Sequence, residues 1–142
     1  MLALAAERAR GAHPYLVTPE HTAKARSVLG SNGWLLPEQA VVLETSRDQA
    51  RAIARRHICR YLDLPNYTNN WRRLDFTDDD LAGQGSNRLV DALVARGDTE
   101  AVARRVKEHL DAGADHVCIQ VFDAEPHDLP LGQWRQLAMA ML

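Results

Sequence analysis

The sequence has little of the features that would place it in a specialised class. Only two of its 142 residues are cysteines, Cys59 and Cys118, which suits a reducing cytoplasm better than a disulfide scaffold. No apolar run reaches membrane-spanning length, and Glu7 and Arg8 come too early for a secretory signal. A net charge of −2 argues against binding nucleic acid by neutralising phosphates. We therefore expect a cytoplasmic protein with neither a membrane nor a nucleic acid as partner.

The motifs of several well-known chemistries are also missing. The sequence contains no P-loop, no GxGxxG, no recognisable Ser/His/Asp arrangement and no paired carboxylates placed for acid/base work. These absences disfavour phosphoryl transfer, Rossmann-type cofactor binding and acyl transfer. The six histidines form no HxxxH or HExxH pair, so no metal site is expected. His57 and His109 lie on helical patterns among apolar neighbours, which favours packing over chemistry.

What is present is the composition of one soluble globular domain, with 46% hydrophobic and 25% charged residues. The most informative stretch runs from Asp98 to Phe122. Asp98 can cap a helix that Gly113 ends, and the following run VCIQVF is apolar on both faces apart from Gln120. A helix that leads so directly into a buried strand predicts a repeating β/α architecture with parallel strands. Such architectures carry their chemistry at the carboxyl ends of the strands.

The same signals predict the other elements. Strands are expected at His13–Val17, Gln39–Glu44 and His116–Val121, parallel, adjacent and in sequence order. Helices are expected at 1–10, 18–30, 46–62, 87–96, 98–113 and 133–142, and an irregular aromatic-bearing connector at 64–75. The first helix has no preceding strand to cover. We therefore expect the chain to be the back part of a larger β/α protein.

Much of the chain resembles one family. The segments GAHPYLVTPEHTAKARSVLG, PNYTNNWRR and HLDAGADHV are similar to the C-terminal half of luciferase-like monooxygenase-family oxidoreductases, above all the branch that uses the deazaflavin coenzyme F420. The resemblance implies that residues 1–142 form a single partial domain of the α/β class. That domain would be about three βα units, strands 6–8, of a (β/α)8 TIM barrel whose N-terminal half is absent. A complete barrel needs about 250 residues.

The resemblance also implies a function. The complete enzyme would transfer a hydride between coenzyme F420 and a small organic substrate, and an FMN-dependent monooxygenase is the close alternative. A third possibility is a non-catalytic half-barrel that acts only by association. The chain alone is expected to be inactive, because the ring-binding front half would be missing. Open strand edges favour a homo-oligomer, or pairing with a separate N-terminal half.

Two groups of residues are candidates for the binding site. His13 and Tyr15 lie on a predicted strand that would point at the barrel mouth, and they either contact the cofactor or pack in the interior. Thr18 opens a helix whose N-terminus could attract the cofactor's anionic tail, although a plain helix cap explains it fully. The second group belongs to the connector and suits a substrate lid or a solvated linker: Asn66, Tyr67, Asn70, Trp71 and Arg72.

Two further features stay open. Five arginines share the polar side of one predicted helix, and nearby acidic residues favour a solvated face for them: Arg47, Arg51, Arg55, Arg56 and Arg60. Gln120 interrupts an apolar strand and needs a hydrogen-bond partner if it is buried. It either points toward a ligand or bonds to a neighbouring strand.

Overall fold

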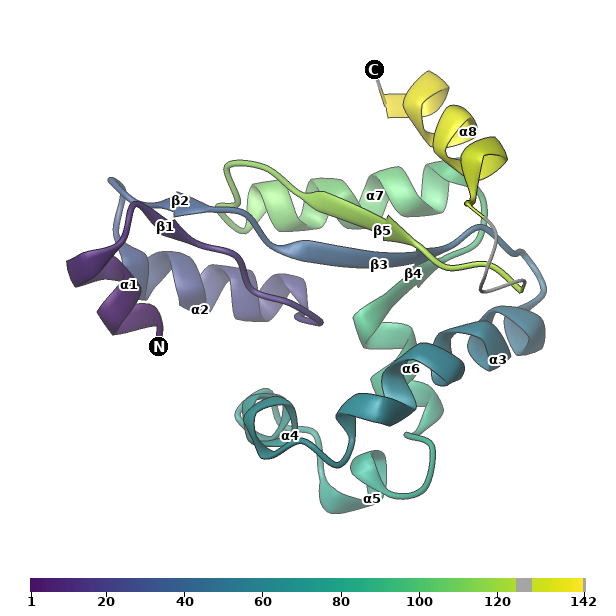
Figure 1. Ribbon diagram of the computed structural model, residues 1–142, viewed down its shortest axis with the longest axis horizontal. Helices are drawn as coiled ribbons and strands as arrows, with labels where there is room; N and C mark the ends of the chain where they lie inside the picture. The colour runs from purple at the N-terminus through teal and green to yellow at the C-terminus, as the bar shows by residue number, and fades with distance from the viewer. Residues whose placement is uncertain (125–128, 142) are drawn as a thin grey trace.

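The structure is a computed structural model that describes residues 1–124 and 129–141. Helices and short strands alternate along much of the chain (Figure 1). The helices are α1 (Leu2–Arg8), α2 (Pro19–Leu29), α3 (Arg47–Ile58), η1 (Cys59–Tyr61), α4 (Pro65–Arg72), α5 (Asp78–Leu81), α6 (Asn87–Leu93), α7 (Thr99–Asp111) and α8 (Leu131–Met141). The strands are β1 (Gly11–Ala12), β2 (Trp34–Leu35), β3 (Glu38–Val42), β4 (Val94–Arg96) and β5 (Cys118–Val121). None of the described helices is long and apolar enough to cross a membrane.

The strands form two small parallel sheets that share one extended segment. β1 pairs with β2, and the second sheet has the order β4-β3-β5 with β3 in the middle. The backbone ladder beside β1 continues past β2, because the Leu36 and Glu38 amides donate to the carbonyls of Ala12 and Pro14 at 3.0 and 2.8 Å. Residues 34–42 therefore provide a hydrogen-bonding partner to every other described strand.

The helix, turn and strand predicted at Asp98–Phe122 are confirmed as elements, but β5 is buried only at Val121 and not along its whole length. The Asp98 carboxylate accepts the Ala101 N–H at 2.8 Å and caps α7. Gly113 follows the helix with φ of 100°, a backbone conformation that glycine adopts without strain. β5 then runs parallel to β3, as predicted. Local signals were sufficient here because cap, stop and apolar run all lie within one short stretch.

The prediction of a strand at His13–Val17 is wrong. The ladder ends at Pro14, and Leu16 adopts a left-handed conformation with φ of 50°. Two contacts hold this turn: the Glu38 carboxylate accepts the Leu16 N–H at 3.1 Å, and the Trp71 indole donates to the Leu16 carbonyl at 3.0 Å. A strand cannot pass through a residue in this conformation.

The predicted helix at 87–96 is also too long. α6 ends at Leu93, and the next three residues form β4, in which Val94 pairs with Ala40. β3 therefore pairs with β5 on one edge and with β4, not His13–Val17, on the other. The strand order β4-β3-β5 in the sheet differs from the order of the strands along the sequence. A partial TIM barrel of strands 6–8 is thus the wrong description of this structure: it is an α/β arrangement with two small parallel sheets. The predicted C-terminal helix is confirmed as α8 as far as Met141, and Leu142 lies outside the described residues.

Side-chain alternation gives the three-stranded sheet two covered faces. Ala40, Val42 and Val94 pack with residues of α3 and α6 on one face. Val41 and Val121 pack on the other face with Val102 of α7 and Leu137 of α8, and Figure 1 shows α7 and α8 on the side of the sheet away from α3. Of the three strand residues expected to be inaccessible, Val42 and Val121 are buried and Ile119 is only partly so.

A buried polar network joins the second face to α2. The fully buried His109 ring accepts from the Thr22 hydroxyl at 2.8 Å through Nδ1 and donates to Gln39 Oε1 at 2.9 Å through Nε2. The amide of Gln39 donates in turn to the carbonyls of Ala40 and Leu93. Burial lowers the pKa of His109 to about 4, which keeps the ring neutral and suited to both roles. The packing role predicted for His109 fits this placement.

Candidate functional site

The carboxyl end of β3 and β5 is hollowed by two adjoining cavities. Ligands of open parallel sheets bind at this end, because the loops that follow the strands gather there. The larger cavity has a volume of about 450 Å³ and the smaller about 300 Å³. Both are lined by Ile53 of α3 and by Phe122 and Asp123, which directly follow β5. We treat the two cavities as one candidate site.

Aromatic rings form one wall of this site. We call them the aromatic cluster: Tyr15, His57, Tyr61, Tyr67 and Phe122. The ring centroids of His57 and Phe122 are 3.8 Å apart, those of Tyr61 and Tyr67 are 4.7 Å apart, and those of Tyr15 and Tyr61 are 5.7 Å apart. Four of the rings, all except Tyr67, line the smaller cavity. The cluster therefore presents π faces and ring edges to an open hollow, a surface suited to a planar conjugated ligand.

A short chain of hydrogen bonds runs through the cluster. The Tyr15 hydroxyl donates to Gln120 Oε1 at 2.8 Å and lies 2.9 Å from Nε2 of His57. Since the single phenolic hydrogen is used toward Gln120, His57 donates through Nε2 and its Nδ1 remains an acceptor. Burial, with a smaller contribution from the charge of Arg60, lowers the pKa of His57 to about 4. Burial likewise raises the pKa of the Tyr15 phenol. Both groups are therefore neutral at neutral pH and can orient a ligand without adding charge.

A carboxyl group lies buried next to this chain. Glu38 is 4% exposed, and its Oε2 accepts the Leu16 N–H while its Oε1 has no hydrogen-bond partner among the described residues. Burial raises the pKa of Glu38 to about 7. The register places Glu38 opposite Cys118, on the same face of the sheet as Gln120. Glu38 lines neither cavity, but it places beside the site a group that can change its charge near neutral pH.

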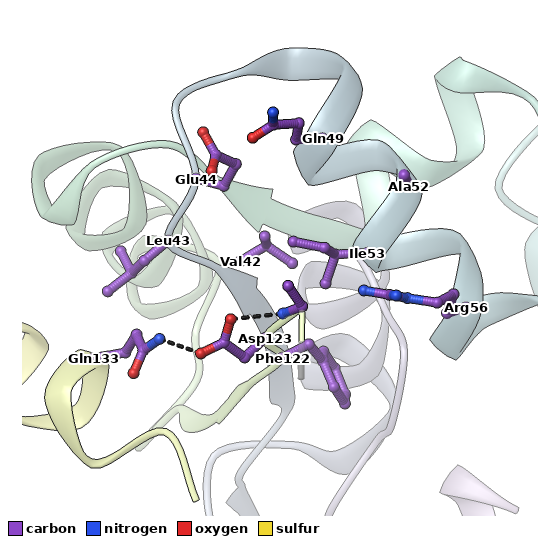
Figure 2. A pocket seen from close by; sticks show the side chains of 11 residues that line it. Val42, Leu43, Glu44, Gln49, Ala52, Ile53, Arg56, Phe122, Asp123 and Gln133 are labelled. Atoms are coloured by element: carbon purple, nitrogen blue, oxygen red, sulfur yellow. Dashed lines mark hydrogen bonds between the residues drawn. The ribbon is translucent and has the colours of Figure 1, made fainter. Parts of the chain in front are cut away.

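Polar side chains line part of the larger cavity, as Figure 2 shows. Asp123 accepts from the Ala124 amide at 2.6 Å and from the side-chain amide of Gln133 on α8. Glu44 accepts the Ser46 N–H at 2.7 Å. The Arg56 side chain points from α3 toward Ile53 and Phe122 (Figure 2).

Of the residues predicted to bind the cofactor, only Tyr15 lies in this site. His13 is exposed, and its Nδ1 contacts the Leu36 carbonyl at 2.5 Å. Thr18 is buried and serves as the N-cap of α2, where its hydroxyl accepts the His21 N–H at 3.4 Å. Neither His13 nor Thr18 lines either cavity. The plain helix-cap interpretation of Thr18 agrees with this geometry.

The predicted substrate residues lie on α4, where an irregular connector was expected. Pro65 at the first helical position explains the start of this helix. Tyr67 joins the aromatic cluster, and Trp71 is fully buried with its indole bonded to Leu16. The other three are remote from the cavities: Asn66 and Asn70 do not line them, and Arg72 forms an exposed ion pair with Asp78 at 2.8 Å.

Sequence reasoning missed much of the site. Tyr61 and Phe122 were not candidates, and His57 was assigned to packing, which its 6% exposure partly supports. Gln120 was predicted to need a hydrogen-bond partner if buried; it is exposed, and it nevertheless accepts a hydrogen bond from Tyr15. The five arginines predicted on one side of a helix carried a usable signal, because two of them, Arg56 and Arg60, each line a cavity.

The described residues fit the ring of a flavin or deazaflavin in part. Tyr61 and Phe122 offer stacking surfaces, and the Tyr15–Gln120 pair offers hydrogen bonds at a ring edge. Both cavities are partly open to solvent, so they cover such a ring incompletely. The comparisons with known proteins add no assignment: no protein-family model matches this chain, and no curated protein matches it.

Proposed function

We propose that this chain supplies a ring-binding surface to an oxidoreductase of the luciferase-like class that uses coenzyme F420, with FMN as the alternative cofactor. The observation that carries the proposal is the aromatic cluster with its neutral His57–Tyr15–Gln120 hydrogen-bond chain at the carboxyl end of the sheet. The resemblance of PNYTNNWRR and HLDAGADHV to that class supports the same chemistry.

The roles of this chain's residues follow from their chemistry. A bound deazaflavin would supply or accept the hydride, as cofactors do in such reactions. Tyr61 and Phe122 would hold the ring by stacking and exclude water from one side of it. Tyr15 would fix the in-plane orientation of the ring, because its hydroxyl is already held between His57 and Gln120. The organic substrate would share the open side of the cavities.

Titration with fluorescent ring ligands tests the proposal. Purified protein is added to FMN and, separately, to coenzyme F420, and the ligand's emission is followed. We expect saturable quenching, because stacking on tyrosine rings quenches flavin fluorescence. The cofactor that binds with the lower Kd identifies the branch of the class, F420-dependent or FMN-dependent, to which the proposed function belongs. Absence of saturable binding for both ligands would contradict the proposal.

Tyr15→Phe is expected to weaken ring binding by roughly 2- to 10-fold, the usual worth of one neutral hydrogen bond. The variant keeps the aromatic ring of this side chain but loses the hydroxyl that orients the ligand. His13→Ala is the matched control: His13 was a candidate on the same segment but lies outside both cavities, so its Kd should not change. The opposite pattern, with His13→Ala weaker and Tyr15→Phe unchanged, would place the ligand elsewhere.

A second candidate function, association with another chain, is favoured by the sheet edge. β5 is the last strand of its sheet in the described residues, with β3 on one side only. Large apolar side chains are also exposed, Trp34 at 60% and Leu4 at 60% among them. Open edges and apolar surface promote association. We expect sedimentation velocity at micromolar concentration to show a dimer or larger species, and a single sharp monomer would rule this candidate out.

A further inference from the structure

Four of the five arginines lie on α3 and Arg60 lies on the η1 turn that continues it, and all except Arg47 fall into two groups in the structure. Arg51 forms a bidentate ion pair with Asp91, with Nε–Oδ1 and Nη2–Oδ2 distances of 3.0 and 2.6 Å. Arg55 donates to Asn87 Oδ1 at 2.6 Å and to the Gly85 carbonyl at 3.3 Å. These two side chains therefore attach α3 to the loop before α6 and to α6 itself.

Arg56 and Arg60 have a different environment. They lie one helical turn apart, so their side chains project from the same face of the helix. Arg56 lines the larger cavity and Arg60 the smaller one, and Phe122 lines both. Within residues 1–124 and 129–141, neither guanidinium takes part in an ion pair or a hydrogen bond. Two cations thus border the aromatic cluster.

The acidic residues of the same walls are already engaged. Both oxygens of Asp123 accept hydrogen bonds, one from Ala124 and one from Gln133, and Figure 2 shows the carboxylate turned toward Gln133. Glu44 accepts from Ser46. Among the described residues that line the two cavities, the arginines are therefore the charged groups with donors available for an incoming ligand.

We propose that Arg56 and Arg60 bind a phosphate group carried by the planar ligand of the aromatic cluster. The inference rests on the ring site proposed above and adds that the ligand carries a negative charge. It also gives the orientation of the ligand, with its ring against Phe122 and Tyr61 and its phosphate toward the outer face of α3. Guanidinium groups suit this role because their planar N–H donors bind phosphate oxygens in pairs. A neutral ring without the phosphate should bind in the same place but more weakly.

FMN and riboflavin separate the two parts of the proposal, since they share one ring system and differ by the phosphate. We expect the unmodified protein to bind FMN roughly 10-fold or more tightly than riboflavin, the effect of charge-assisted hydrogen bonds. In the double variant Arg56→Ala/Arg60→Ala the two ligands should bind equally, with the Kd of riboflavin within about twofold of its original value. Added salt should also reduce the preference, because both arginines are exposed.

Arg47→Ala is the control for loss of a positive charge from the same helix. Arg47 belongs to the same helix and is exposed, but it lines neither cavity, so its variant should keep the full preference for FMN. A far-UV circular dichroism spectrum and a urea midpoint for each variant check that folding is unchanged.

Each other outcome counts against the inference in a distinct way. Equal binding of FMN and riboflavin by the unmodified protein overturns the phosphate subsite and leaves the ring site standing. A loss of preference in Arg47→Ala equal to that of the double variant shows general attraction to a basic helix, which also overturns it. Failure of both flavins to bind overturns the ring site, and the phosphate subsite with it.

Discussion

Trp71→Ala is expected to lower the free energy of unfolding by about 3–5 kcal/mol, as removal of a buried large aromatic does. Trp71 is fully buried on α4, and its indole N–H is bonded to the Leu16 carbonyl at 3.0 Å. The variant would lose this packing and leave the carbonyl of a left-handed residue unpaired. Urea denaturation followed by far-UV circular dichroism measures the loss without relying on tryptophan emission.

Two comparisons show whether burial or the hydrogen bond dominates. Trp34→Ala removes a side chain that is 60% exposed and should cost less than about 1 kcal/mol. Trp71→Phe keeps most of the apolar volume but removes the N–H, and an intermediate cost of about 1–3 kcal/mol is expected from the unpaired carbonyl. If Trp71→Ala were no more damaging than Trp34→Ala, α4 would not be anchored as described.

The second large effect is a loss of stability on mild acidification. Burial lowers the pKa of His57 and of His109 to about 4, so between pH 6.5 and 4 the unfolded state binds two protons that the folded state does not. Burial raises the pKa of Glu38 to about 7, so between pH 7 and 4.5 the folded state binds one proton that the unfolded state does not. Together, these shifts mean that the unfolded state binds one more proton than the folded state in this pH range. Stability should fall by about 1.4 kcal/mol per pH unit from pH 6.5 to 4.5.

Glu38→Gln gives this prediction a sharp test. The variant cannot take up the compensating proton, so the slope should approach two protons, about 2.7 kcal/mol per pH unit over the same window. His21, whose pKa burial also lowers, adds to the loss in both proteins. Urea midpoints measured at half-unit intervals from pH 7 to 4.5 give both slopes. Parallel curves for the two proteins would show that Glu38 is already ionised across the window.

The sequence predicted the elements whose signals are local. The Asp98 cap, the stop at Gly113 and the apolar run of β5 lie close together, so no distant contact was needed to recognise them. The pairing of β3 with β5 followed from their apolar character on both faces. The left-handed turn at Leu16 could not be foreseen, because the groups that hold it, Glu38 and Trp71, are 22 and 55 residues away in the sequence.

The site was harder to predict for the same reason. Tyr15 and Gln120 were both noticed, but as separate residues, since they are 105 positions apart. β4 was missed because three residues that continue an apolar helical pattern carry no strand signal of their own. Their place beside β3 depends on the pairing of Ala40 with Val94.

The central position of residues 34–42 has a consequence for folding kinetics. This segment hydrogen-bonds to β1 early in the chain but also to β4 and β5, and the network through Gln39 reaches His109, 70 residues later. Contacts between such distant parts form slowly, because the intervening chain must be ordered before they contribute. During synthesis β3 would emerge well before β4 and β5, and it would remain without β5 until residues 118–121 have been made. We expect slow refolding in which protection of the Ala40–Val42 amides and of β5 from hydrogen exchange develops together.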